Sequence, residues 1–132
     1  MTMRYLIDTD WVTHYLSGRD DIVRRLDALQ REGLGVSVIS LAELYEGIYY
    51  STAPDGNEQD LHDFLRGVNI LGIDEEICKI FGRERGRLRK AGQRIGDFDL
   101  LIAATGLHYG LTVLTNNRQH FERVEGLPIE SV

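Results

Sequence analysis

Arg4-Tyr-Leu-Ile-Asp8 is the stretch that decides the fold. Its run of apolar residues predicts a short strand buried on both faces, as strands are in a parallel sheet. The strand ends directly in the carboxylate of Asp8, which is costly to bury unless it is paired. Thr9 or Asp10 then caps a predicted helix from Trp11 to Ser17. A buried strand, a charged group at its end and a helix form the start of an α/β unit.

The same alternation of strand and helix continues to the end of the chain. Further strands are predicted at 35–39, 68–73 and 111–115, with a last extended piece around 128–130. Helices are predicted from Asp20 or Asp21 to 29, and at 40–50, 58–66, 75–91, 97–107 and 118–121. This order predicts an α/β fold, a three-layer α/β/α arrangement around a central parallel sheet of four to five strands.

Composition places the chain among soluble globular proteins. Its 132 residues suit a single domain over 1–132, and 42% hydrophobic with 27% charged residues is ordinary for such a domain. No apolar run approaches the roughly 20 residues of a membrane span, and the apolar N-terminal stretch is too short for a signal peptide. We therefore expect a cytoplasmic protein with no membrane partner. The single cysteine excludes an intrachain disulfide.

Charge is unevenly distributed along the chain. The net charge of −6 argues against a nucleic-acid binder, but residues 79–94 hold seven basic groups and only one acidic group. Several of them share one face of the predicted helix 75–91. This face is either a phosphate-binding strip or a solvated surface. The candidates for substrate binding on it and just beyond it are Arg83, Arg87 and Arg94.

Polar side chains gather where the predicted strands end. Asp8, Glu43, Asn116 and Asn117 follow strands, and ligands of open α/β sheets bind at the carboxyl ends of the strands. Asp99 joins them only if the helix from Asp97 starts at that same edge. Clustered carboxylates repel one another unless a cation lies between them, and oxygen ligands suit Mg²⁺ or Mn²⁺. A divalent metal site is therefore one interpretation of this pattern.

Each of these residues also has a structural interpretation. Ser40 and Glu43 match the pattern of a capping box that opens a helix. Asp97, Asp99, Asn116 and Asn117 all sit at helix starts, where Asp and Asn are favoured as caps. For any one of these residues alone, capping is the preferred interpretation over catalysis. Asp8 is the exception, because a carboxylate directly after a buried strand favours a functional role.

Four blocks, in order, resemble the PIN-domain ribonuclease toxins of the VapC type. They are Leu6-Ile-Asp-Thr-Asp10, Val38-Ile-Ser-Leu-Ala-Glu-Leu44, Ile95-Gly-Asp-Phe-Asp-Leu-Leu-Ile-Ala-Ala104 and Val113-Leu-Thr-Asn-Asn117 followed by Phe121. The resemblance runs nearly from end to end. It implies an endoribonuclease with a Mg²⁺ or Mn²⁺ cofactor, an RNA substrate, a cognate antitoxin as inhibitor, and a homodimer.

The resemblance also assigns roles to residues. It implies catalytic roles for Asp8, Glu43, Asp99 and Asn117, with the three carboxylates as metal ligands. The supporting residues are Thr9, Asp10, Ser40, Asp97 and Asn116. Two positions depart from the family pattern: Asp10 stands where Asn is frequent, and Asn117 stands where a fourth acid is frequent. Asn117 would be a neutral ligand or would orient water.

Two rival functions fit parts of the sequence. Asp8-Thr-Asp-Trp-Val12 has the Asp-x-Asp-x-Val form of haloacid dehalogenase-type phosphatases, in which Asp8 would be a nucleophile and Asp10 its partner. No convincing later lysine accompanies it. The second rival is a non-catalytic RNA-binding PIN-like domain. The presence of all three motif acids argues against it.

Overall fold

A five-stranded parallel sheet forms the centre of the molecule, described here for residues 2–132 by a computed structural model. The strand order is β3-β2-β1-β4-β5, and each neighbouring pair is parallel. The first strand along the chain is therefore the middle strand of the sheet. The strands are β1 (Tyr5–Ile7), β2 (Leu34–Ser37), β3 (Asn69–Leu71), β4 (Thr112–Leu114) and β5 (Ile129–Glu130).

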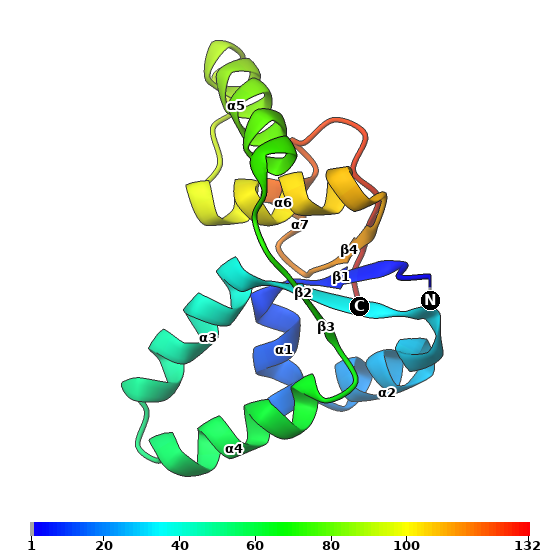
Figure 1. Cartoon of the computed structure of the whole chain (residues 1–132), viewed down its shortest axis with the longest axis vertical. Helices are drawn as coiled ribbons and strands as arrows, with labels where there is room; N and C mark the ends of the chain where they lie inside the picture. Colours follow the sequence, from blue (N-terminus) through cyan, green and yellow to red (C-terminus); the bar gives the residue numbers. More distant parts are fainter. Residues whose placement is uncertain (1) are drawn as a thin grey trace.

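Helices cover both faces of the sheet (Figure 1). One face carries α1 (Thr9–Leu16), α2 (Asp20–Leu29), α3 (Val38–Tyr49) and α4 (Pro54–Leu65), with a short 3-10 helix at Gln30–Glu32. The other face carries α5 (Glu75–Lys90), α6 (Asp97–Tyr109) and α7 (Arg118–Phe121). Of the helices formed by residues 2–132, none is long and apolar enough to cross a membrane.

Alternating side chains of the central strands divide the core into two parts. Leu6 and Val113 belong to the cluster under α5, α6 and α7, whereas Ile7 and Leu114 belong to the cluster under α1 to α4. Successive side chains of a strand point to opposite faces, so both faces of β1 and β4 are buried. The predicted three-layer α/β/α fold is confirmed.

Several predicted boundaries are wrong, each for a local reason. The first helix begins at Thr9, and its cap is Asp8 rather than Thr9 or Asp10. The second strand ends at Ser37, because the Ser37 side chain accepts a hydrogen bond from Ile39 N and starts α3 at Val38. The predicted loop 52–57 is partly helical, since Pro54 occupies the first helical position of α4, where its missing N–H costs nothing.

The start of β1 is held by the loop before β2. Gly33 O accepts hydrogen bonds from Arg4 N and Tyr5 N, and Gly33 has a φ of 91°. A Cβ built on Gly33 would collide with Thr2 O and lie 2.8 Å from Met3 Cα. Only glycine satisfies both requirements without strain.

Gly33→Ala should therefore destabilise the fold more than Gly18→Ala does. Gly18 also has a positive φ, 82°, but its Cβ would meet nothing within 4 Å. We expect a loss of about 1 kcal/mol for Gly18→Ala, from backbone strain alone, and clearly more for Gly33→Ala. Urea unfolding followed by circular dichroism measures both, and equal losses would contradict the steric argument.

Candidate active site

Asp8 lies at the carboxyl end of the middle strand and is almost fully buried, with 4% exposure. Its backbone N–H donates to Leu114 O of the neighbouring strand at 3.0 Å. Its side chain caps α1: Thr9 N donates to Oδ1 at 2.8 Å, and Thr115 Oγ1 donates to Oδ2 at 2.7 Å. The carboxylate is therefore fixed in orientation by the strand, the helix and the loop after β4.

Burial raises the pKa of Asp8 from 3.8 to about 7. The hydrogen bond from Thr115 opposes this shift, the negative charge of Asp10 adds to it, and the charge of Asp99 adds a smaller amount. Strongly perturbed acids of this kind concentrate at functional sites. The carboxyl edge of the sheet is therefore a region of concentrated negative charge.

Glu43 faces Asp8 across the first turn of α1. Thr9 Oγ1 donates to Glu43 Oε1 at 2.7 Å, which ties α3 to the start of α1. The capping-box interpretation of Ser40 and Glu43 is wrong, because α3 begins three residues earlier than that pattern requires. Ser40 Oγ is instead buried without a hydrogen-bond partner among the described residues. Glu43 is thus free of a capping role and directed toward the carboxyl edge.

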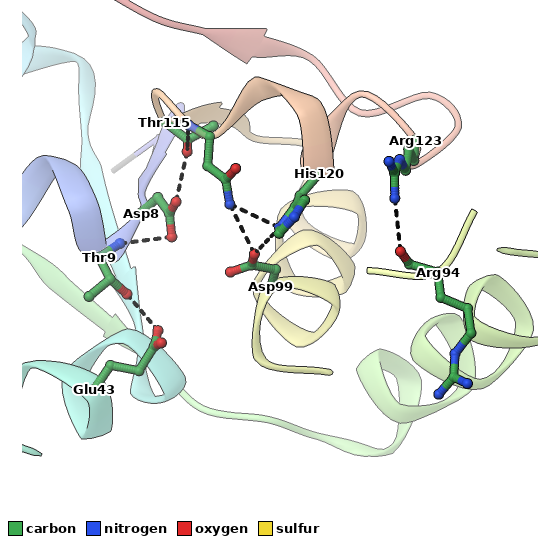
Figure 2. Close-up of polar contacts among 9 residues, drawn as sticks. Asp8, Thr9, Glu43, Arg94, Asp99, Thr115, His120 and Arg123 are labelled. Atoms are coloured by element: carbon green, nitrogen blue, oxygen red, sulfur yellow. Dashed lines mark hydrogen bonds and ion pairs between the residues drawn. The ribbon is translucent and has the colours of Figure 1, made fainter. Parts of the chain in front are cut away.

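Asp99 reaches the same edge from α6. In Figure 1, α5 stands on α6 and projects away from the sheet, and the segment that follows α5 leads back to the start of α6. Because α6 leads into the start of β4 and runs back along it, its own first turn lies near the end of β4. The helix from Asp97 therefore starts at the carboxyl edge, which is the condition for Asp99 to join the other acids. Asn117 Nδ2 donates to Asp99 Oδ2 at 3.1 Å, and Asn117 N donates to Thr115 Oγ1 at 2.9 Å. Figure 2 shows Asp8 and Glu43 together on one side of Asp99.

Asn116 and Asp10 form a hydrogen bond between the loop after β4 and α1. Asn116 N donates to Asp10 Oδ2 at 3.0 Å, while Asn116 Oδ1 accepts from Trp11 Nε1 at 3.0 Å and from Val132 N at 3.1 Å. The loop after β4 is thereby tied to α1 and to the last residue of the chain. Asp10 Oδ1 is buried and has no partner among the described residues.

Other predicted residues lie away from the carboxylates. Asp97 is in the first turn of α6 but makes no capping hydrogen bond; it pairs with Arg85 at 3.0 Å. Arg87 forms a two-bond ion pair with Glu84 and also donates to Arg123 O. Arg83 and Arg94 are exposed, and Figure 2 shows the Arg94 side chain turned away from Asp99.

His120 belongs to the site, although no sequence motif selected it. Its Nδ1 lies 2.8 Å from Asp99 Oδ2 and 3.0 Å from Asn117 Nδ2 (Figure 2). None of the four histidines shows the spacing of metal ligands. The one usable signal was position, since His120 follows Asn117 by three residues and so lies about one helical turn away from it.

The donor set suits a hard divalent cation. The groups at the edge are carboxylate and amide oxygens, the ligands that Mg²⁺ and Mn²⁺ prefer. The unpartnered Asp10 Oδ1 and the raised pKa of Asp8 both indicate uncompensated negative charge. Within residues 2–132, no three acidic, histidine or cysteine side chains are close enough to form a metal shell by themselves. An ion held through one or two carboxylates and several waters fits this spacing.

Comparison with known families defines the class of protein. A model of the PIN domain matches residues 5–127, which include every strand of the sheet except β5 and all four motif blocks. The chain therefore belongs to the PIN domain family.

Similar proteins narrow this class. The chain is 35% identical over 131 residues to Ribonuclease VapC2 of Haemophilus influenzae, and 98% of each chain is covered. It is 29% identical to the tRNA(fMet)-specific endonuclease VapC of Salmonella typhimurium, covering 97% of each. Among solved structures, VapBC2 from Rickettsia felis bound to a promoter DNA fragment superposes with a TM-score of 0.92 at 29% identity, covering 98% of this chain and 99% of that one. The family predicted from the four blocks, PIN proteins of the VapC type, is confirmed.

The pKa of Asp8 predicts how stability depends on pH in metal-free protein. Folded Asp8 loses its proton near pH 7 and unfolded Asp8 near 3.8, so between these values the folded chain holds more protons. Its contribution to stability is greatest at low pH and falls as the pH rises toward 7. Asp8→Asn cannot ionise and removes this fall.

We therefore expect Asp8→Asn to stabilise the chain more at pH 8 than at pH 5, by about 2–3 kcal/mol from about 1.4 kcal/mol per pKa unit. Urea unfolding in EDTA at both pH values measures the difference. The same gain at pH 5 and pH 8 would contradict the raised pKa.

Proposed function

We propose that the chain is a metal-dependent endoribonuclease toxin that cleaves RNA phosphodiester bonds and is neutralised by a cognate antitoxin. The observation that carries the proposal is the convergence of Asp8, Glu43 and Asp99 from β1, α3 and α6 on the carboxyl edge of the sheet. Its relatives named ribonuclease and tRNA endonuclease support the reaction class.

The chain's own residues have distinct roles in this proposal. A bound Mg²⁺ or Mn²⁺ supplies an activated water and offsets charge on the reacting phosphate. Asp8, Glu43 and Asp99 hold that ion directly or through water, and Asn117 orients Asp99 or water by its amide. Thr9 and Thr115 donate to the carboxylates and hold them in place before substrate arrives.

The rival functions have less support. The whole-chain match is to PIN domains rather than to phosphatases. Asp10, the second acid of the phosphatase pattern, accepts from Asn116 N beside a buried unpartnered oxygen. A non-catalytic domain has no need for Asp8, Glu43 and Asp99 at one edge of the sheet.

RNA contacts are proposed for the basic strip of α5 and for Arg94, four residues beyond the end of that helix. Arg83 and Arg94 are exposed and make no side-chain ion pair among the described residues. Arg87 is the weaker candidate, because its guanidinium is engaged by Glu84. Single Lys and Arg side chains contribute a salt-dependent attraction to phosphates. We propose the cytoplasm as the site of action, and the homodimer predicted from the resemblance stays a prediction.

The antitoxin is proposed to bind a groove lined by residues of α1, α3 and α4, three helices that cover the same face of the sheet in Figure 1. The groove has a volume of about 330 Å³; Leu16, Leu44 and Ile48 form its apolar part, and Glu43 and Asp60 are its acidic groups. Its apolar lining and acidic groups suit a segment that is both apolar and basic. Solved relatives of this chain are VapBC complexes, which supports a protein partner here.

Asp99→Asn should abolish RNA cleavage while the fold is retained. The substitution removes one charge from the proposed metal site, so we expect a loss of rate of about a hundred- to a thousandfold, as for other groups that act on the transition state. Asp97→Asn is the matched control, because Asp97 lies two residues away and pairs with Arg85 instead. Cleavage of total cellular RNA in Mg²⁺, Mn²⁺ or EDTA measures both, and an active, folded Asp99→Asn protein would contradict the proposal.

Filling the groove should weaken antitoxin binding. Gly47 lines the groove, and a Cβ there meets nothing within 4 Å, so Gly47→Trp projects into free space. We expect binding of the cognate antitoxin to weaken by tenfold or more. Gly82→Trp on α5 is the control, since its surroundings are equally open. Unchanged affinity of the Gly47→Trp protein in a titration would place the partner elsewhere.

A further inference from the structure

The imidazole of His120 lies against the carboxylate of Asp99 (Figure 2). His120 Nδ1 is 2.8 Å from Asp99 Oδ2, and Asn117 Nδ2 is 3.1 Å from the same oxygen. The two nitrogens are 3.0 Å from each other. Asp99 belongs to α6, His120 to α7, and Asn117 to the loop before α7. Their three polar atoms form a triangle in which Asp99 Oδ2 accepts from both nitrogens.

The short contact determines where the imidazole proton lies. An ionised carboxylate only accepts hydrogen bonds, so the distance of 2.8 Å requires an N–H at His120 Nδ1. That N–H exists both in the imidazolium and in the neutral ring with its proton on Nδ1. The contact therefore does not depend on the charge of the ring.

The two oxygens of Asp99 have different surroundings. Oδ2 receives the donors of His120 and Asn117. Of the hydrogen bonds found in residues 2–132, none reaches Oδ1, and Figure 2 shows this second oxygen on the side of Asp8 and Glu43. The pair of donors on Oδ2 thus fixes the direction of the oxygen that remains available.

The backbone that carries His120 is firmly held. The next residue, Phe121, is fully buried in the core under α6 and α7. His120 itself keeps 41% of its side chain exposed, so it lies at the rim of the site rather than in the core. Other acids of the site also receive side-chain donors: Thr115 donates to Asp8, and Thr9 donates to Glu43. His120 and Asn117 donate to Asp99 in the same way.

We propose that His120 is a positioning residue for the metal: its Nδ1–H holds Asp99 so that the other oxygen of that carboxylate faces the divalent ion. The proposal rests on the proposed function, because it assumes an ion at Asp99. Partners that orient a metal ligand commonly change metal affinity by about 10- to 100-fold when removed. His120 acts on the ion through Asp99 and not through its own Nε2.

Two amide variants separate these two atoms. In His120→Asn the amide nitrogen lies near the position of Nδ1, so the donor to Asp99 is retained. In His120→Gln the amide lies near the position of Nε2, and the donor to Asp99 is lost. His120→Ala removes both groups. A purely structural role for the ring would make all three variants behave alike.

The test is Mn²⁺ binding by the full-length metal-free chain, measured from the electron paramagnetic resonance signal of free Mn²⁺ at constant pH. We expect Kd to rise by about tenfold or more for His120→Ala and His120→Gln, as is usual for such partners, and to stay within about threefold of the wild type for His120→Asn. Circular dichroism verifies that each variant is folded. RNA cleavage at subsaturating Mn²⁺ should follow the same order, and excess Mn²⁺ should restore it.

His108→Asn is the matched control. His108 also faces an acidic side chain, with Nε2 3.7 Å from Asp74 Oδ2, but it lies nine residues from Asp99 along α6. At 1.5 Å per residue this separates the two positions by roughly 14 Å. We expect its Mn²⁺ affinity to equal that of the wild type.

Three results would overturn the inference. Wild-type affinity in His120→Ala and His120→Gln would show that Asp99 needs no such partner. Retained affinity in His120→Gln with loss in His120→Asn would assign the role to Nε2. If the wild type bound no Mn²⁺, or bound it as tightly as Asp99→Asn does, the metal site itself would be refuted, and the proposed function with it.

Discussion

The rest of the site depends on one constraint: a carboxylate is buried at the end of the middle strand. Asp8 tolerates this position because Thr9 N and Thr115 Oγ1 donate to its two oxygens. The same hydrogen bonds join α1 and the loop after β4 to the sheet. Burial nevertheless leaves its pKa near 7, so the charge that the fold concentrates here is only partly compensated. Because uncompensated negative charge destabilises the folded chain, a cation bound at this edge would stabilise it.

Topology explains how distant parts of the chain reach this carboxylate. Parallel strands end at a common edge, so helices and loops that follow β1, β2 and β4 all begin near Asp8. Asp99 does not follow a strand and arrives by a different route. It lies in the first turn of α6, which packs against α5 and runs antiparallel to β4, so that this turn lies near the end of that strand.

Small polar residues position the acids at this site. Thr9 and Thr115 link Glu43 and Asp8, and Asn117 with His120 links Asp99 to the loop after β4. Asn116 binds this loop to Trp11 and to Val132, so the C-terminal residue contributes to the rigidity of the site. Threonine and asparagine donors orient a carboxylate without cancelling its charge, which leaves that charge available for a cation.

The sequence by itself determined the layer architecture, because buried apolar strands that alternate with helices leave a pattern along the chain. Its four blocks determined the family through their resemblance to it, and Asp8, Glu43 and Asp99 as site residues stay a prediction from that resemblance. It also located α5 and its Asp74 cap, since capping is a local interaction. Only the tertiary structure decided that Glu43 is no capping residue, that Asp99 lies beside Asn117, and that His120 belongs to the site. The first of these facts follows from the Ser37 cap that starts α3 earlier. The other two depend on contacts between residues 18 and 21 positions apart, Asp99 with Asn117 and Asp99 with His120. Helical and strand periodicity describes only near neighbours, so such contacts leave no local signal.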